Sequence, residues 1–571
     1  MLNRQGSSLA EIRNAISALP GADLTAWDVS QLRGTAQARA SSDPNAEARD
    51  QRNRALANWE PGYPGERIDY YEEYIQRHAP VNVGWLDVPN GETSEREVLR
   101  EVTGVGVLRS SSSDAVEHVV APLDDGSLSI WDLSARSRTT AGGGGRLLDQ
   151  TLPGFFTGLG SEETTKSHGI MTETGAVECV SVDSGSKKGF FAVGNMLHEV
   201  DLSTMQRAGA KQYPFPITAL SESRDNVPIT VGTNMTVHLH DPRDDAFTKK
   251  DTKSAGELIG GSIYSHATLS QPGPLSILHH PGIDASEASI WVAGRFTSLL
   301  NYDRRFFPRL RGTIHSGARV ACLSALPYPH IPRDLDLMRN PKASLLDHQI
   351  AKTTPGTTIL AAAEYKGKGS LEQYGIPSLS SYQNRQTASA SKLLSVTPHG
   401  GRIVFSDGDG NLKWMERDGF SHVRSYNIND AIRTSPTEQN GNYHDSRAPG
   451  IWSSTASETP GQGDIVQKLI PTSPTVSSSG TDRPDIPLTN LLLWTGDGRL
   501  GVLGFGHEDP LASARGAVEE WHDAVESQHA AGAAEARSRE DAEKQYALRM
   551  RRALERNADE VRFVRGLGMG V

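Results

Sequence analysis

The sequence predicts a mainly β fold, a seven-bladed β-propeller, flanked by an N-terminal helical segment and a long C-terminal helix. A short hairpin pattern recurs seven times in the middle of the chain, and this is the main observation behind the prediction. In addition, 56 glycines and 31 prolines are spread along the 571 residues. Short apolar runs bounded by Gly, Asp, Asn or Ser indicate strands and tight turns rather than helices.

In each copy of the pattern, a strand of small and apolar residues enters a turn of Gly, Asp or Asn, and a second strand leaves it. Asp-Gly and Asn-Gly steps supply the positive φ angles that two-residue hairpin turns need. The clearest copy is VVAPLDDGSLSIWDLSA, residues 119–135, with its turn at Asp125-Gly126 and its exit at Trp131-Asp132. The other six copies span residues 190–203, 228–244, 289–303, 359–375, 402–419 and 491–506.

A radial arrangement of four-stranded sheets explains why these hairpins would occur in series. Such sheets leave few open edges, so the arrangement avoids edge-to-edge aggregation. Small residues that precede the turn suit the crowded inner strands of wedge-shaped blades. They are Ala121, Ala192, Ala293 and Ala362.

Four segments follow from the changes in pattern. Residues 1–58 read as a polar helical segment, and residues 59–97 as an aromatic-rich linker that packs on the propeller. Residues 98–507 form the propeller, and residues 508–566 a C-terminal helix with a narrow apolar stripe that includes Trp521. Four stretches rich in Ser, Gly, Pro and Thr are predicted to be long surface loops inserted between the hairpins. They are residues 139–174, 247–286, 328–358 and 434–487.

The hairpin region resembles the WD-repeat (WD40) family. Ile130-Trp131-Asp132 stands where that family has its Trp-Asp step, and residues 315–327, HSGARVACLSALP, resemble the His-bearing start and first inner strand of a blade. The closest copies are about 40 residues apart, the length of one blade of this kind. The resemblance covers roughly residues 100 to 507 and implies a non-catalytic protein-binding ring.

The N-terminal region resembles fungal F-box/WD-repeat proteins with a degenerate or truncated F-box. Leu19, Pro20, Asp23, Leu24 and Val29 match the latter half of an F-box, and residues 64–85 resemble the segment that joins F-box and propeller. This resemblance implies the substrate-receptor subunit of an SCF-type (cullin) ubiquitin ligase. Those five residues would bind the ligase's adaptor, and the propeller would bind the target protein. The alternative is a WD-repeat scaffold of another intracellular complex, in trafficking or RNA metabolism.

Five arginines follow the fourth hairpin, where a loop between two blades is expected. Arginine binds carboxylates and phosphates through paired hydrogen bonds, so this group would suit an acidic or phosphorylated peptide. The alternative is a solvated loop whose Phe306-Phe307 pair packs on the propeller. The five residues are Arg304, Arg305, Arg309, Arg311 and Arg319.

The residues present give no catalytic set, so we expect no enzyme, no cofactor and no metal. The sequence has no nucleophile elbow, no phosphate-binding glycine loop and no zinc-protease helix. Residues 407–411, DGDGN, resemble the start of a calcium loop, but Leu412 stands where that loop needs glycine, which favours a hairpin turn. His238 with His240, and the pair His279-His280, are expected to be ordinary strand residues rather than ligands.

Charge and cysteine content bear on partners and location. Lys and Arg number 58 against 69 Asp and Glu, a net charge of −11, so no nucleic acid partner is expected. Cys179 and Cys322 are the only cysteines and lie in apolar runs, which favours a reducing compartment. The first 20 residues do not resemble a signal peptide, and no apolar run approaches the ~20 residues that span a bilayer. We therefore expect a cytoplasmic or nuclear protein with protein partners and no membrane.

Overall fold

The structure is a computed structural model, and it describes residues 49, 63 and 70–506, apart from short gaps and several loops. The gaps lie at 89–90, 94–95, 99, 112–114, 134–144, 157–176, 178, 224–226, 241–265, 282–287, 338–339, 341, 377–380, 430–463 and 473–489. The predicted N-terminal helical segment, except for residue 49, and the predicted C-terminal helix therefore lie outside the described residues. No helix among the described residues is long and apolar enough to cross a membrane.

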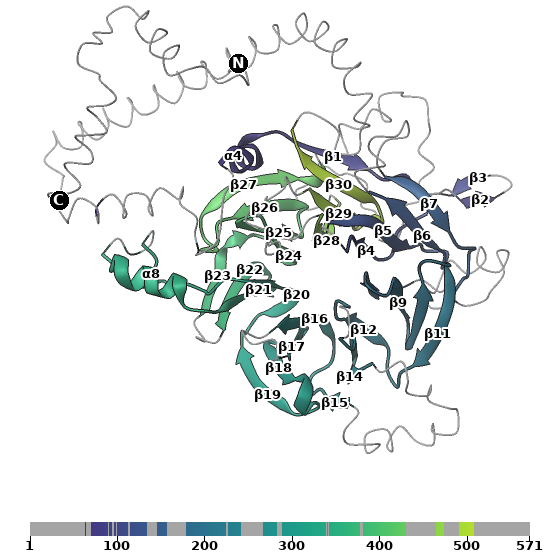
Figure 1. Ribbon diagram of the computed structural model, residues 1–571, viewed down its shortest axis with the longest axis horizontal. Coiled ribbons are helices and arrows are strands. Elements are labelled where there is room, and N and C mark those ends of the chain that lie inside the picture. The colour runs from purple at the N-terminus through teal and green to yellow at the C-terminus, as the bar shows by residue number, and fades with distance from the viewer. Residues whose placement is uncertain are drawn as a thin grey trace, which may run out of the picture.

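Seven four-stranded antiparallel sheets stand around a central axis, which confirms the prediction of a seven-bladed β-propeller (Figure 1). We number the blades along the chain. Blade 1 contains β4 (Gly106–Arg109), β5 (Val116–Pro122), β6 (Leu128–Asp132) and β7 (Arg146–Gln150). Blade 2 contains β8 (Cys179–Asp183), β9 (Lys188–Val193), β10 (Met196–Asp201) and β11 (Gln206–Gln212). Blade 3 contains β12 (Ile217–Leu220), β13 (Thr230–Thr233), β14 (Thr236–Leu239) and β15 (His266–Thr268).

The remaining blades follow the same order. Blade 4 contains β16 (Pro274–Pro281), β17 (Ala288–Gly294), β18 (Ser298–Asp303) and β19 (Leu310–His315), with the short helix η3 (Arg304–Phe306) before its last strand. Blade 5 contains β20 (Arg319–Leu326), β21 (Thr357–Tyr365), β22 (Lys368–Ile376) and β23 (Ser381–Ser389), with helix α8 (Leu345–Thr353) after its first strand. Blade 6 contains β24 (Leu393–His399), β25 (Arg402–Asp407), β26 (Asn411–Met415) and β27 (His422–Asn427). Blade 7 contains β28 (Val466–Pro471), β29 (Leu491–Thr495) and β30 (Leu500–Phe505).

The ring is closed by a strand from the N-terminal side of the propeller. β1 (Val81–Trp85) pairs antiparallel with β30, with Val83 opposite Leu503, and forms the outer strand of blade 7. Helix α4 (Tyr70–His78) precedes it, and the small hairpin of β2 (Gly91–Thr93) and β3 (Arg96–Val98) follows it. The segment that was predicted as a linker on the propeller therefore supplies one strand of the ring itself.

All seven predicted hairpins are the second and third strands of a blade. Their turns use glycine where the backbone requires it, as at Gly126 (φ 75°) and Gly194 (φ 58°). The resemblance of residues 315–327 to the start of a blade is also confirmed, because β20 is the first strand of blade 5.

The predicted long loops need correction, because they contain regular elements. β7 lies in the first of these stretches, β15 and β16 in the second, α8 in the third and β28 in the fourth. The outer strands were not predicted because they are largely solvated, so apolar and polar side chains do not alternate clearly along them. Every described side chain of β7 except Leu147 is exposed, for example.

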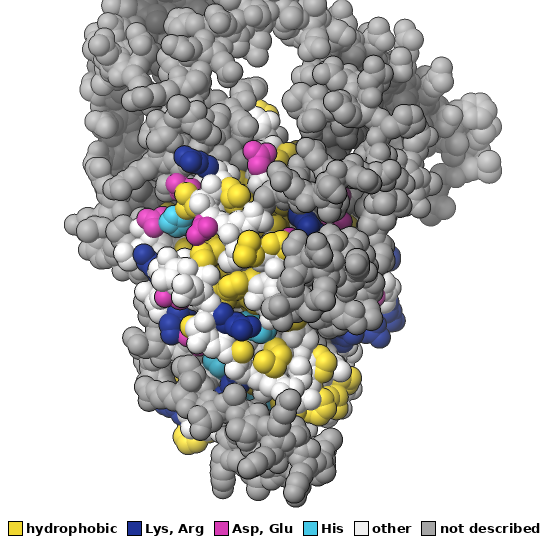
Figure 2. Space-filling view, turned by 90° about the vertical axis from the view of Figure 1, so that its right-hand side faces the viewer, with side chains coloured by type: hydrophobic (Ala, Val, Ile, Leu, Met, Phe, Trp, Pro, Cys, Tyr) yellow, Lys and Arg dark blue, Asp and Glu magenta, His cyan; other side chains and the backbone are white. Residues whose placement is uncertain are grey.

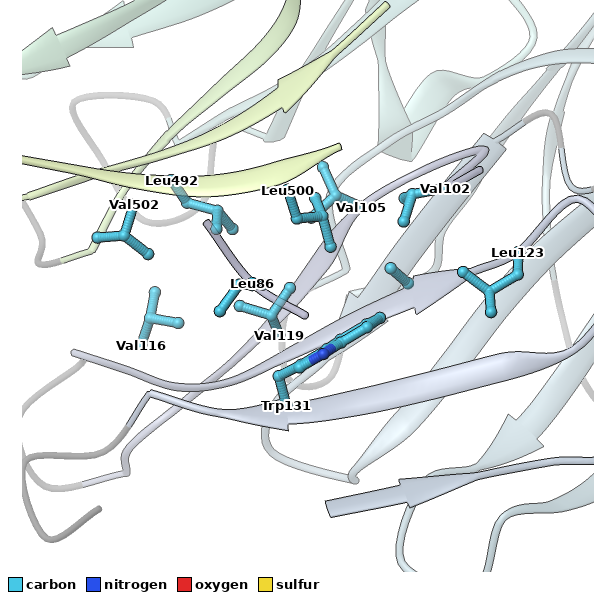
Figure 3. Close-up of a cluster of buried hydrophobic side chains, with 11 residues drawn as sticks. Leu86, Val102, Val105, Val116, Val119, Leu123, Trp131, Leu492, Leu500 and Val502 are labelled. Carbon is cyan, nitrogen blue, oxygen red and sulfur yellow. The ribbon is translucent and has the colours of Figure 1, made fainter. Parts of the chain in front are cut away.

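The core consists of seven apolar clusters, one between each pair of neighbouring blades. Successive residues of a strand point to opposite sides of its sheet, so each blade packs against both neighbours. In β5, Val119 and Ala121 face blade 7 while Val120 faces blade 2. Figure 3 shows the cluster that closes the ring, where Leu492, Leu500 and Val502 of blade 7 meet blade 1. The small residues predicted before the turns, Ala121, Ala192, Ala293 and Ala362, are all fully buried in these clusters.

The Trp-Asp step has a structural role at this closing cluster. Trp131 is completely buried, and its indole N–H donates to the backbone carbonyl of Asp87 at 2.9 Å. Asp87 lies two residues after the end of β1, so the indole ties the third strand of blade 1 to the segment that leaves blade 7.

Candidate protein-interaction face

The two faces of the ring differ in what they carry. In an antiparallel four-stranded sheet the connections alternate between its two ends. One face, here called the hairpin face, carries the turns between second and third strands. The opposite face, here called the clamp face, carries the connections between first and second and between third and fourth strands. α4 and α8 belong to the clamp face, on the left-hand side of the ring in Figure 1.

Arginines of blade 6 hold α4 on the clamp face. Arg402 is 1% exposed and its Nη2 donates to Glu73 Oε2 at 2.9 Å and to Gln76 Oε1. Arg424 donates to the backbone carbonyls of Gln76 (2.7 Å) and Ala79 (2.9 Å), at the C-terminal end of the helix. These are carbonyls that a helix end cannot satisfy internally, so the arginine both caps and anchors it.

An ion pair completes the attachment of α4. Arg77 of the helix lies 2.7 Å from Glu416 and 2.7 Å from Glu73. The carboxylates of Glu416 and Glu73 raise the pKa of Arg77 against the opposing effect of burial, so this guanidinium stays charged.

Upstream of α4, Tyr63 is fixed to the same face by stacked rings. It stacks on Tyr328 with 4.6 Å between ring centroids, and the guanidinium of Arg417 lies 5.1 Å from the Tyr63 ring and 4.7 Å from the Tyr328 ring. The Tyr63 hydroxyl donates to the carbonyl of Pro329 at 2.9 Å, and burial raises its pKa to about 12. Tyr63, α4 and β1 thus bring the chain onto the ring along the clamp face.

Exposed apolar side chains gather on the clamp face. Of the nine large hydrophobic residues that are exposed in the described part of the chain, six lie there. Exposed apolar side chains are typical of protein-interaction sites, so we take this face as the candidate for partner contacts. We call these six the apolar arc: Phe306 and Leu310 of blade 4, Leu346 and Ile350 of α8 in blade 5, Phe420 of blade 6, and Tyr74 of α4.

The five predicted arginines are divided by the structure. The turn that holds Arg304, Arg305 and Arg309 joins the third and fourth strands of blade 4, so it is not the expected loop between blades. Arg311 follows at the start of β19. Arg319 begins β20 of blade 5, beyond the full length of β19, and so lies on the hairpin face.

The arginines that remain together border the apolar arc. Arg305 pairs with Asp303 at 3.1 Å, but its side chain is half exposed, and Arg309 and Arg311 are exposed beside Phe306 and Leu310. Arg304 is partly buried, and burial lowers its pKa. The predicted packing of both phenylalanines on the propeller holds for Phe307, which meets the Tyr302 ring at 5.8 Å, while Phe306 is 66% exposed.

α8 is the part of the arc that sequence reasoning missed. Its helical signal was present: Ser344 is an N-cap whose side chain accepts from the amide of Asp347, and Leu346 and Ile350 are one helical turn apart. The Pro and Thr residues of this segment masked the short helix. The predicted adaptor-binding residues Leu19, Pro20, Asp23, Leu24 and Val29 lie outside the described residues.

The residues considered as metal ligands form ordinary hydrogen bonds. The carboxylate of Asp407 accepts the amides of Asp409 (3.0 Å) and Asn411 (2.9 Å), the hydroxyl of Ser389 (2.6 Å) and lies 3.2 Å from the Lys413 ammonium. These contacts build a hairpin turn. Within the residues that the structure describes, no group of three His, Cys, Asp or Glu is placed to hold a metal ion.

The histidines are likewise part of the packing. His240 Nδ1 lies 3.0 Å from the Tyr213 hydroxyl and His279 Nε2 lies 2.8 Å from the Thr230 hydroxyl. His238 Nε2 bonds Thr236 at 2.7 Å, and burial lowers the pKa of His238 to about 3.

The rim seen in the side view has no single charge. Figure 2 shows the side formed by the right-hand part of the ring in Figure 1, and its coloured surface mixes apolar, basic and acidic side chains. This mixture fits a surface for varied protein contacts better than a dedicated polyanion surface.

Comparison with known proteins does not place the chain in a family. The chain matches no protein-family model, and no curated protein matches it. The fold and the apolar arc are therefore the basis for assigning a function.

Proposed function

We propose that this protein is a non-catalytic interaction platform that binds partner proteins on the clamp face. The fold is typical of interaction scaffolds, and the concentration of exposed apolar groups in the apolar arc is the observation that carries the proposal. Phe306 supplies an aromatic anchor, and aromatic residues and arginine are the residues that contribute most to binding at protein interfaces. Arg305, Arg309 and Arg311 beside it favour a partner segment with acidic or phosphorylated residues.

A matched pair of triple variants tests this assignment. The first places glutamate in the arc, Phe306→Glu, Ile350→Glu and Phe420→Glu. The control places glutamate at three exposed leucines outside it, Leu148→Glu, Leu152→Glu and Leu275→Glu. We expect quantitative affinity purification to recover partner proteins with the wild type and the control but not with the arc variant.

Folding of both variants is checked by circular dichroism and thermal melting. The assignment of the clamp face is wrong if the arc variant keeps the partners, or if the control loses them to the same extent.

The finer proposal is that the platform is the substrate receptor of a cullin-type ubiquitin ligase, acting in the cytoplasm or the nucleus. Its support is the resemblance of residues 18–36 to the latter half of an F-box. The attachment of Tyr63 and α4 to blades 5 and 6 adds that the chain joins the ring on the clamp face, the face proposed to bind target proteins.

Binding of the full-length chain to the purified ligase adaptor tests the finer proposal. We expect the wild type to bind, and Leu19→Asp with Leu24→Asp to abolish binding, whereas Leu9→Asp with Ile16→Asp retains it. If the wild type does not bind the adaptor, the ligase role is wrong, and the platform belongs to another complex, such as one in trafficking or RNA metabolism.

A further inference from the structure

A cavity of about 740 Å³ lies on the rim of blade 2, away from the apolar arc. It is lined by β10, β11 and the first part of the connection from blade 1, including Phe156, Met196, His198 and Arg207. Its volume falls within the range of small-molecule sites, about 300 to 1,000 Å³. β11 lies at the right-hand edge of the ring in Figure 1, on the side that Figure 2 shows.

The strand register explains why this cavity exists. Met196 and His198 lie two residues apart in β10 and therefore point to the same side of the sheet. Ala210 is opposite His198 in β11, and Arg207 is opposite Val200, so both are on this side as well. Because Ala210 carries only a methyl group, the space above the imidazole stays open.

The cavity combines an apolar wall with two polar groups. Phe156 supplies the wall, with its ring centroid 5.3 Å from that of His198. His198 is only 5% exposed, yet its Nδ1 has no hydrogen-bond partner among the described residues. This nitrogen is closed off from solvent, so a ligand in the cavity would meet the other ring nitrogen, Nε2.

Arg207 is the one charged residue in the described lining of the cavity, and its positive charge favours an anion. Burial, and then the nearby positive charge of Arg207, lower the pKa of His198 to about 4, so the imidazole is neutral at physiological pH. A neutral imidazole can donate one N–H. Arg207 is exposed on the edge strand, and the contact from its Nη1 to the Phe156 carbonyl is long, at 3.5 Å.

We propose that this cavity is a binding site for a small organic anion, a carboxylate with an aromatic or apolar body. The carboxylate accepts hydrogen bonds from the Arg207 guanidinium and the His198 imidazole, and the apolar body packs between Phe156 and Met196. This site goes beyond the proposed platform function and does not depend on it.

Phenylacetate is the probe, and its neutral analogue phenylacetamide is the comparison. Binding to the full-length protein is followed by saturation-transfer NMR titration. We expect saturable binding of phenylacetate that weakens about tenfold in Arg207→Gln, the effect of losing one charge-assisted hydrogen bond. Ala210→Phe, which fills the space above His198, should abolish binding. Both substitutions lie on a solvated edge strand, so the fold is retained.

Arg319→Gln is the control, because it removes the same charge from the exposed start of β20 in blade 5, outside both the cavity and the apolar arc. It should bind phenylacetate as the wild type does. Equal binding of phenylacetamide and phenylacetate overturns the preference for an anion. Binding that survives in both Arg207→Gln and Ala210→Phe, or no saturable binding of phenylacetate to the wild type, overturns the site.

Discussion

Asp464 lies directly before the first strand of blade 7, on the hairpin face. Its Oδ1 accepts the backbone amides of Ile465 (2.7 Å), Gly496 (3.0 Å) and Asp497 (3.1 Å). Burial, followed by the neighbouring carboxyl group of Asp497, raises the pKa of Asp464 to about 7. The turn is therefore stabilised when the carboxyl group of Asp464 is protonated. When Asp464 is ionised, its negative charge lies beside that of Asp497.

The stability of the protein should therefore fall as the pH rises through this range. The folded state holds a proton on Asp464 that the unfolded chain loses near pH 4, so stability decreases between about pH 4 and pH 7. Asp464→Asn mimics the protonated form. We expect it to raise the Tm at about pH 8 and to change the Tm little at about pH 5. Calorimetry at both pH values is the measurement, and an equal Tm change at both would show that Asp464 is ionised throughout.

Glu372 is also buried, but hydrogen-bond donors surround its carboxylate. It is fully buried in blade 5, where it accepts from the hydroxyls of Ser316 (2.5 Å), Ser370 (3.1 Å) and Tyr374 and lies 3.5 Å from the Arg385 guanidinium. Ser316 belongs to the connection from blade 4, so this network joins two blades.

Removing the carboxylate leaves several buried donors without an acceptor. We expect Glu372→Leu to destabilise the protein by about 3 kcal/mol, and Glu372→Gln, which keeps an acceptor oxygen, by clearly less. Urea unfolding of both variants measures the difference. A cost for Glu372→Leu no greater than for Glu372→Gln would show that the hydrogen bonds contribute little.

At the scale of the element, α4 depends on blade 6 more than on its own sequence. The helix has only nine residues, too few to be stable alone in water. Arg424 satisfies two carbonyls at its C-terminal end, and its guanidinium also lies 5.5 Å from the Phe505 ring of β30.

Arg424→Met should therefore release the end of α4 from the ring. Limited digestion with trypsin measures this, because Arg77 lies within the helix and becomes accessible only when the helix detaches. We expect cleavage after Arg77 about tenfold faster than in the wild type, which corresponds to the loss of about 1.4 kcal/mol of local stability. Arg309→Met, on an exposed turn of blade 4, is the control and should leave the cleavage rate unchanged.

At the scale of the whole molecule, β1 decides whether the ring is closed. In each of the other six blades, the outer strand follows the third strand of the same blade along the chain. β1 instead precedes all the other strands of the ring in the chain, so its pairing with β30, and not a loop, holds it in blade 7. Gly501 in β30 permits this pairing, because a side chain there would come within 3.0 Å of Val83 and Trp85.

Gly84→Pro removes a strand-pairing donor in β1 and should open the ring. The N–H of Leu86 donates to the carbonyl of Leu500, and Gly84, two residues earlier in the same register, points its N–H to β30 as well. Gly312→Pro makes the same change in β19, an outer strand whose blade stays connected. We expect Gly84→Pro to cost about 3 kcal/mol and to lower the Tm more than Gly312→Pro does. Thermal melting followed by circular dichroism is the measurement. An equal or smaller effect of Gly84→Pro would show that the ring does not depend on β1.

The sequence by itself determined the number of blades and the central hairpin of each. Turn chemistry is local, since Asp125-Gly126 specifies a tight turn wherever it stands. Strands buried on both sides also have a recognisable composition, as in the run Val119-Val120-Ala121, whose alternate residues face two different blades.

Only the tertiary structure decided how the ring is closed and what its faces carry. The sequences of the outer strands β7 and β15 show no strand pattern of their own. These segments are strands because they form backbone hydrogen bonds with β6 and β14. The pairing of β1 with β30 joins residues more than 400 positions apart, which no local pattern encodes. The apolar arc arises in the same way, because its residues come from blades 4, 5 and 6 and from α4. The cavity over His198 depends on the pairing of β10 with β11 and on Phe156 from the connection between blades 1 and 2.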